Sequence, residues 1–134
     1  MNTVVNFELA KLLKEKRFNL KVKQRWSVVE NIDGNKSSFC QYDCGLFNWN
    51  SKKYHEFSSA PTIAEVVMWL YEKHGIWINV DAGVNGFYGH YKINPIGTLS
   101  SNLKQSWVNT EENPYKLPTE AYIAAIEYVL KNLI

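Results

Sequence analysis

Two cysteines and three histidines are the residues whose types could bind a metal or supply a nucleophile: Cys40, Cys44, His55, His74 and His90. Structural zinc sites usually combine two compact ligand pairs, and this sequence has one Cys-x-x-x-Cys pair without a second. On one strand the two cysteine Cα atoms would lie about 13 Å apart, which is too far for a disulfide. We therefore predict reduced, buried thiols, no metal and no cofactor. A Cys/His nucleophilic pair is the alternative interpretation.

A second candidate for chemistry is the pair Asp81 and His90. The dipeptide Asn85-Gly86 favours a two-residue type I′ turn, and pairing outward from this turn places Asp81 directly opposite His90. A neighbouring carboxylate favours a cationic imidazole and could support a hydrolase or transferase, but opposite charges across two strands more often only stabilise a sheet. Because the sequence shows no catalytic constellation, we predict that the protein is not an enzyme.

The same register sorts the side chains of this hairpin onto two faces. The aliphatic side chains of the paired region, among them Ile78, Val80 and Ile93, share one face, which we predict to be core. The opposite face is aromatic and polar, and we predict that it is a binding surface formed by Trp77, Asp81, Tyr88, His90 and Lys92. The alternative is that the first helix or residues 94–117 cover this face.

Positive charge is concentrated near the N-terminus of the sequence. Residues 1–25 hold seven Lys or Arg and two Glu, whereas the remaining residues hold eight Lys or Arg and eleven acidic residues, so that the net charge is only +2. Such a segment is either a solvated surface or a patch for an anionic partner. The candidate patch consists of Lys14, Arg17, Lys21, Lys23 and Arg25, and it makes binding of a nucleotide or nucleic acid the alternative function.

Three helices are expected to position these residues. The first covers about 7–17 and has Asn6 as its N-cap. The second begins at the capping-box residue Thr62 and ends before Gly75, whose lack of a side chain suits the left-handed residue beyond a helix. The third runs from Pro118 to the last residue and is capped by Thr119.

Alternating apolar residues predict a first hairpin over 20–32 and 38–47, with Val28 on the apolar side and Asp33-Gly34 in the turn. Its register stays open, because a two-residue loop sets Val28 against Phe39 and a loop longer by one residue sets it against Cys40. A further edge strand is expected within 103–108.

These elements predict one domain, residues 1–134, with an α+β fold. We expect an antiparallel sheet of four to five strands with helices packed on one face, in the order α-ββ-α-ββ-(β)-α. The second and third helices are apolar around much of their circumference, and a homodimer is therefore an open possibility.

Three stretches of the sequence, 6–16, 60–78 and 118–122, resemble small proteins encoded by phages and prophages of gut bacteria, a group without an established activity. The resemblance implies an accessory protein of a phage or mobile element that acts in the bacterial cytoplasm, and it transfers no site residues. The sequence departs from expectation at Arg17, where a glycine would close the first helix. Either the helix continues or it ends without a left-handed cap.

Aromatic residues make up 14% of the sequence, and Trp and Tyr are common in interaction surfaces. No stretch approaches the length of a membrane span, and the N-terminus does not have the pattern of a signal peptide. We therefore hypothesise a non-enzymatic interaction module that binds a host or phage protein through the face containing Trp77 and Tyr88.

Overall fold

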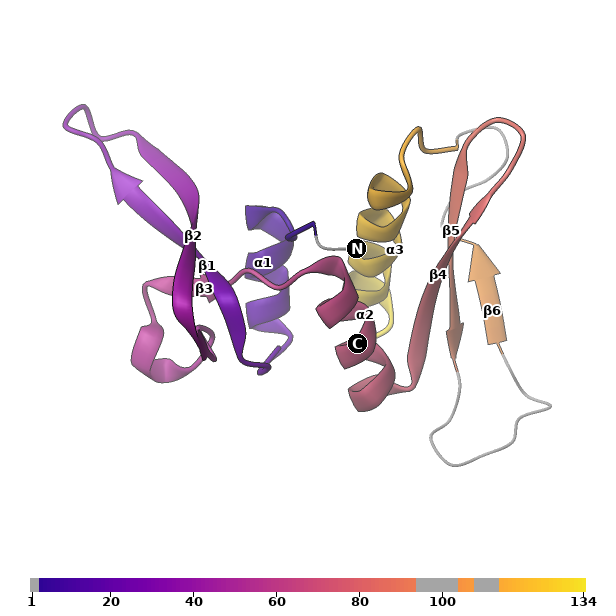
Figure 1. Ribbon diagram of the computed structural model, residues 1–134, viewed down its shortest axis with the longest axis horizontal. Helices are drawn as coiled ribbons and strands as arrows, with labels where there is room; N and C mark the ends of the chain where they lie inside the picture. The colour runs from indigo at the N-terminus through magenta and orange to yellow at the C-terminus, as the bar shows by residue number, and fades with distance from the viewer. Residues whose placement is uncertain (1–2, 94–103, 108–113) are drawn as a thin grey trace. The chain divides into compact units, whose positions relative to one another are not determined.

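Figure 1 shows the computed structural model, which describes residues 3–93, 104–107 and 114–134. The helices are α1 (Phe7–Glu15), α2 (Ile63–His74) and α3 (Pro118–Asn132), together with a short 3-10 helix, η1 (Lys52–Tyr54). The strands are β1 (Val22–Glu30), β2 (Lys36–Phe47), β3 (Phe57–Ser59), β4 (Ile76–Ala82), β5 (Phe87–Ile93) and β6 (Lys104–Trp107). None of the described helices is long and apolar enough to span a bilayer.

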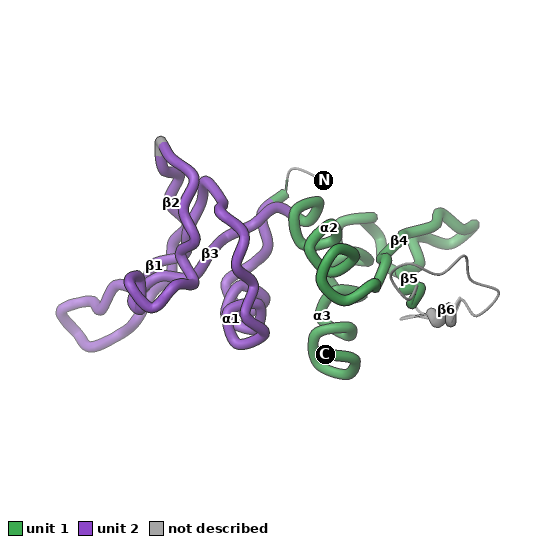
Figure 2. The backbone as a smooth tube through the Cα atoms, turned by 90° about the horizontal axis from the view of Figure 1, so that it is seen from below, with its two compact units in different colours: residues 1–3, 63–134 green, residues 4–62 purple. Residues whose placement is uncertain are grey.

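The chain forms two compact units, which are coloured separately in Figure 2. Unit 2 comprises residues 4–62, and unit 1 comprises residues 1–3 and 63–134. Each unit contains a three-stranded antiparallel sheet, with the order β2-β1-β3 in unit 2 and β4-β5-β6 in unit 1. The α+β class with antiparallel pairing is therefore confirmed, although the strands are divided between two sheets. The single domain stays a prediction.

Both ends of α1 are closed by local interactions. The Asn6 side chain accepts a hydrogen bond from the N–H of Leu9 at 2.8 Å, as predicted for the N-cap. At the other end the N–H of Phe18 donates to the carbonyl of Leu13, and Arg17 has a φ of 63°. This is a Schellman motif with arginine in the left-handed position. Both sequence-based alternatives, a longer helix and an end without a left-handed cap, are therefore wrong.

The register of the β1–β2 hairpin differs from both predicted alternatives. Val28 pairs with Ser38, because the loop contains three residues between Asn31 and Asn35. The N–H of Gly34 donates back to the carbonyl of Asn31, and Gly34 has a φ of 83°. A three-residue loop that places glycine in the left-handed region is a common hairpin solution. The hairpin extends beyond α1, so Val28 is exposed instead of belonging to the core.

In unit 1, α2 and α3 cover one face of the sheet (Figure 1). The core side chains come from both helices and from β4, and they include Val66, Trp69, Leu70, Ile78, Ile126 and Leu130. At Gly89 the backbone of α3 approaches the sheet so closely that an added Cβ would lie 2.7 Å from the carbonyl oxygen of Ala121. The absence of a side chain at Gly89 therefore sets how closely α3 packs on β5.

The ends of the unit 1 helices agree only partly with expectation. Gly75 follows α2 with a φ of 66°, as predicted. The N-cap of α3 is Leu117, not Thr119, because Pro118 already has helical geometry as the first helical residue. The N–H of Leu117 is satisfied by the carboxylate of Glu120 at 3.2 Å. The edge strand expected within 103–108 is confirmed as β6, which pairs with β5.

The β4–β5 hairpin is shifted by two residues from the predicted register. β4 ends at Ala82 and β5 begins at Phe87, and between them the N–H of Gly83 donates to the carbonyl of Gly86 at 2.7 Å, so the turn is centred on Val84 and Asn85 instead of on Asn85 and Gly86. His90 consequently pairs with Asn79, and the predicted direct pairing of His90 with Asp81 is wrong. A shift of two residues leaves every side chain on the same face. The predicted division into an aliphatic and an aromatic-polar face therefore holds.

Candidate functional site

The candidate site is a groove in unit 2 with a volume of about 420 Å³. One wall is the surface of α1, and the other is formed by the sheet and the segment that leads into β3. The lining residues are Phe7, Lys11, Lys14, Glu15, Trp26, Val28, His55, Glu56, Phe57 and Ser58. Because all of them belong to residues 4–62, the groove lies within a single unit.

The apolar part of the groove is fixed by the contact between α1 and β1. The rings of Phe7 and Trp26 lie 5.8 Å apart at an interplanar angle of 56°. The indole N–H of Trp26 donates to the carbonyl of Val5 at 3.1 Å. Because this N–H is the only polar group of the side chain, the rest of the indole presents an apolar surface. Val28 extends this surface along the same face of β1 and is 45% exposed. The groove therefore offers a rigid aromatic floor next to an accessible aliphatic side chain.

The two lysines of the groove are already engaged within unit 2. The ammonium of Lys14 donates to the carbonyls of His55 and Phe57, and burial lowers the pKa of this lysine. Lys11 forms an ion pair with Glu8 at 2.8 Å and lies 4.9 Å from the ring centre of Phe7. The Lys14 contacts join α1 to the segment that leads into β3, whereas the Lys11 contacts lie within α1. Both sets of contacts reduce the positive charge that the groove can offer to a ligand.

Glu15 and Glu56 provide the remaining charge of the groove. Both are exposed, and neither forms an ion pair among residues 3–93, 104–107 and 114–134. The groove thus combines an apolar floor with two available carboxylates at its rim. This arrangement is complementary to an apolar segment that is flanked by positive charge.

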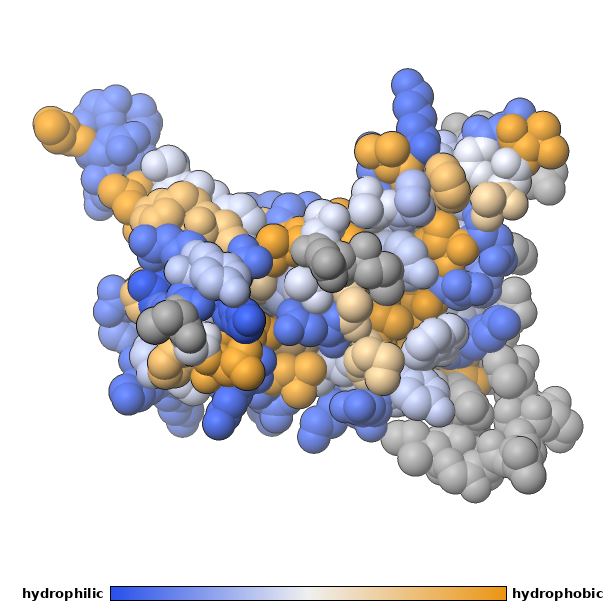
Figure 3. Space-filling view, viewed as in Figure 1, coloured by the Kyte–Doolittle hydropathy of each residue, from blue (hydrophilic) through white to orange (hydrophobic). Residues whose placement is uncertain are grey.

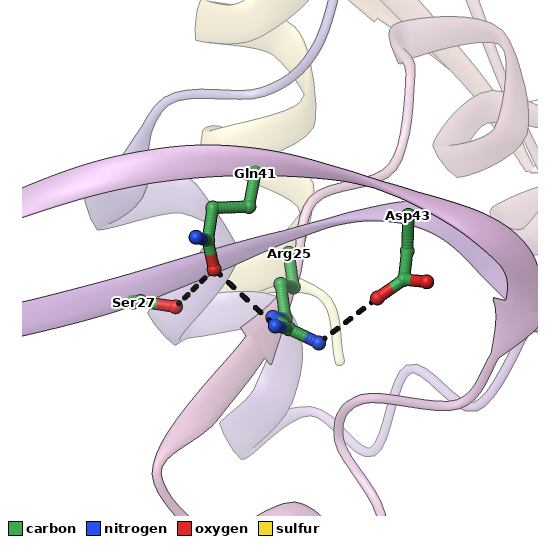
Figure 4. A network of polar contacts seen from close by, with 4 residues as sticks. All are labelled: Arg25, Ser27, Gln41 and Asp43. Atoms are coloured by element: carbon green, nitrogen blue, oxygen red, sulfur yellow. Dashed lines mark hydrogen bonds and ion pairs between the residues drawn. The ribbon is translucent and has the colours of Figure 1, made fainter.

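The opposite face of the unit 2 sheet contains a polar network centred on Arg25 (Figure 4). The guanidinium donates to Asp43 at 3.1 Å and to Gln41 at 3.3 Å. Its carbon lies 4.4 Å from the ring centre of Trp49 and 4.3 Å from that of Phe57. Stacking and a carboxylate partner together are typical of a structural arginine.

The predicted basic patch is therefore divided between different roles. Lys14 and Arg25 make internal contacts, and Arg17 forms the helix cap with its backbone. Lys21 is exposed, and the ammonium of Lys23 lies 5.9 Å from the ring centre of Tyr42. Arg17, Lys21 and Lys23 are exposed, so the side chains of these three of the five predicted residues remain accessible to an anion.

The predicted aromatic-polar face of β4 and β5 is present in unit 1, but its members differ in exposure. Trp77 is 39% exposed, and its ring packs edge-to-face against that of Tyr71 in α2 at 5.6 Å. Tyr88 is half-buried, with its ring over Gly83. Lys92 is half-buried and lies opposite Trp77. The exposed aromatic area on this face is therefore smaller than the sequence indicated.

His90 and Asp81 remain close despite the shifted register. They lie diagonally across the two strands, with 3.4 Å between Nδ1 and Oδ2. His90 is only 1% exposed, and burial lowers its pKa more than the carboxylate raises it. Desolvation of the charged ring outweighs the attraction to Asp81, so the burial of His90 favours the neutral imidazole over the cationic form that the sequence suggested.

The prediction of reduced, buried thiols can be compared with the structure at Cys40. This thiol is half-buried, donates to Oε1 of Gln24 at 3.3 Å, and has a pKa raised by burial. The described residues contain no group of three or more His, Cys, Asp or Glu that could hold a metal ion.

Sequence reasoning did not find the groove. The available signal was the spacing of Phe7, Lys11 and Lys14, which places them on one side of a helix, with Trp26 on the following strand. Comparisons with protein-family models, curated proteins and solved structures give no match to this chain.

Proposed function

We propose that the protein is a non-enzymatic interaction module, an accessory protein of a phage or mobile element in the bacterial cytoplasm. It binds a host or phage protein through the unit 2 groove. The observation that carries this proposal is the aromatic floor formed by Phe7 and Trp26 beside the exposed Val28. Aromatic side chains that are held rigidly next to a groove are typical anchors of protein interfaces.

The partner segment is expected to be apolar and flanked by Lys or Arg. Its apolar side chains would cover Trp26 and Val28, and its cations would approach Glu15 and Glu56. A partner segment flanked by acidic residues is less suitable, since Lys14 already donates to two carbonyls and Lys11 is paired with Glu8. Electrostatic complementarity of this kind selects among partners more than it adds affinity.

Two neighbouring valines provide a matched test of this surface. Val28 and Val29 are 45% and 44% exposed, and they lie on opposite faces of β1, so only Val28 lines the groove. A partner captured from phage-infected or lysogenic bacteria is purified, and its affinity is measured for both variants. Val28→Glu should weaken binding at least tenfold, whereas Val29→Glu should leave it nearly unchanged.

A third variant tests the sheet face of unit 1. If Trp77→Ala abolishes binding and Val28→Glu has no effect, the groove is not the binding surface. If every captured partner binds the wild-type chain and all three variants with the same affinity, the proposed function is wrong.

Nucleic-acid binding is the second candidate, and it is supported by Lys23 beside Tyr42. This tyrosine is 69% exposed, and an exposed ring next to a cation is an arrangement used to stack bases. Such binding should weaken steeply with salt and be lost on charge reversal at Lys21 and Lys23. Binding to single-stranded oligonucleotides that does not respond to salt would exclude this candidate.

A further inference from the structure

We infer that the outer edge of β2 pairs with β2 of a second copy across a two-fold axis at Phe39. The proposed function neither requires nor implies this self-association. β2 is the edge strand of the unit 2 sheet, and β1 pairs with only one of its sides. From Ser37 to Tyr42 every residue except Cys40 is exposed. The backbone N–H and C=O groups on the outer side are therefore available to another strand.

The central part of this edge, residues 37–42, lacks the features that normally prevent strand pairing. Natural edge strands are short, or they carry charges, prolines or bulges. Residues 37–42 contain neither charge nor proline, and the irregular pairing of β2 begins only after Tyr42. Two other edge strands show such protection, because β3 has three residues and β4 carries Asp81.

The hairpin also has a large share of the exposed apolar surface. Of the thirteen large hydrophobic residues that are exposed in the described part of the chain, seven lie between Val28 and Phe47. Hydrophobic residues, coloured orange, are visible along this hairpin and at its tip in Figure 3. On β2 they include Phe39 and Tyr42, which lie on opposite faces of the strand. A second strand at this edge would cover part of both faces.

The backbone alternation restricts how two copies can pair. The N–H of Asn31 donates to Asn35 within the hairpin, so the odd-numbered residues of the regular part of β2 direct their backbone groups toward β1. Lys36, Ser38, Cys40 and Tyr42 consequently direct theirs toward the open edge. In an antiparallel pair, opposite residues both point toward the partner strand or both away from it. A two-fold axis must therefore pass through a residue, not between two residues.

An axis at Phe39 gives the best match of side chains. It places Phe39 opposite Phe39 of the second copy, in the close pairing without hydrogen bonds. It also places Lys36 opposite the second copy's Tyr42, where the ammonium can lie over the ring. An axis at Cys40 places Phe39 opposite the second copy's Gln41, and an axis at Gln41 places it opposite the second copy's Asp43.

Light scattering with size-exclusion chromatography tests the interface. The wild-type chain should elute as a dimer, and Phe39→Lys should convert it to a monomer because two like charges would face each other directly. Leu46→Lys is the matched control, since Leu46 is 55% exposed on the same strand but lies beyond the paired stretch. This control should remain dimeric.

Cysteine cross-linking tests the register. In a chain with Cys40→Ser and Cys44→Ser, Phe39→Cys should give a covalent dimer on mild oxidation, because opposite Cα atoms in this pairing lie about 4.5 Å apart. Ser37→Cys should not cross-link with itself but should cross-link with a Gln41→Cys chain. A monomeric wild-type chain, a dimer that survives Phe39→Lys, or a Ser37→Cys chain that cross-links with itself overturns the inference.

Discussion

Arg25 donates a hydrogen bond from Nη1 to Oδ2 of Asp43 at 3.1 Å, and this contact joins β1 to β2 on the face that carries Trp49 and Phe57. Both side chains are mostly buried, with exposures of 21% and 26%. The guanidinium is therefore part of the packing of unit 2 and has limited access to an external anion.

Asp43→Ala should lower the free energy of unfolding by about 1–3 kcal/mol, because it leaves a largely buried guanidinium without its carboxylate. Arg25→Lys should also destabilise, since an ammonium cannot reproduce the contacts of a planar guanidinium with the rings of Trp49 and Phe57 while it also donates to Asp43 and Gln41. Urea unfolding measures both effects. The control is Glu30→Ala, which removes an exposed acid from the same hairpin and should change stability little. Equal losses in Asp43→Ala and Glu30→Ala would contradict this account.

Arg17 should be a site of stabilisation. A non-glycine residue in the left-handed region costs roughly 1–2 kcal/mol, and Arg17 adopts it at a φ of 63°. Arg17→Gly removes this strain but adds freedom to the unfolded chain, so the expected net gain is about 0.5–1 kcal/mol. Arg17→Ala is the control, because it removes the charge and keeps the strain. If the melting temperature rises equally in both variants, the stabilisation comes from removal of the Arg17 charge and not from relief of backbone strain.

The sequence was sufficient to predict those elements whose signals are local. Asn6 and Gly75 fix one end each of α1 and α2, and both predictions are confirmed by the structure. Thr119 failed as a cap because proline can occupy the first helical position and moved the start of α3 to Pro118. The strand β3 was missed because three residues carry too little alternation to be distinguished from a loop.

The candidate sites depended on registers that the sequence does not fix. The dipeptide Asn85-Gly86 favours a two-residue loop made of these two residues, yet in the observed turn Gly83 pairs with Gly86, which has a φ of 148°. The predicted face of His90 is nevertheless correct, because a register shift of two residues keeps each side chain on the same face. The burial of His90 could not be predicted, because alternation along a strand does not show what covers each face. The groove requires α1 to lie against Trp26, which is a tertiary contact without a local signal.

Gly89 should be intolerant of a side chain. An added Cβ would lie 2.7 Å from the backbone oxygen of Ala121 and 3.1 Å from Cβ of Ala125, so α3 would have to move away from β5. We expect Gly89→Ala to cost about 1–3 kcal/mol of stability. Gly83→Ala is a comparison, since there the obstacle is the ring of Tyr88, which can rotate away. Thermal unfolding of both variants measures the difference, and an equal loss would show that the contact with α3 is not decisive.

His90 should make the stability of unit 1 depend on pH. Burial lowers its pKa below the ordinary value of 6.5, Asp81 raises it by a smaller amount, and Lys92 lowers it further. Above pH 6.5 the imidazole is neutral in both the folded and the unfolded chain, and the full stability is present. As the pH falls, the unfolded chain takes up the proton first, so the free energy of unfolding decreases until the pH passes the lower pKa of the folded state.

Urea unfolding between about pH 7.5 and about pH 5.5 measures this decrease. His90→Gln should flatten the pH dependence whatever its effect on absolute stability. His74→Gln should flatten it in part, because burial and Lys73 lower the pKa of His74 as well. The titration of the two imidazoles by NMR provides the direct check. If His90 titrates at or above pH 6.5, the attraction to Asp81 dominates the burial of the ring, and stability would instead be retained on acidification through that range.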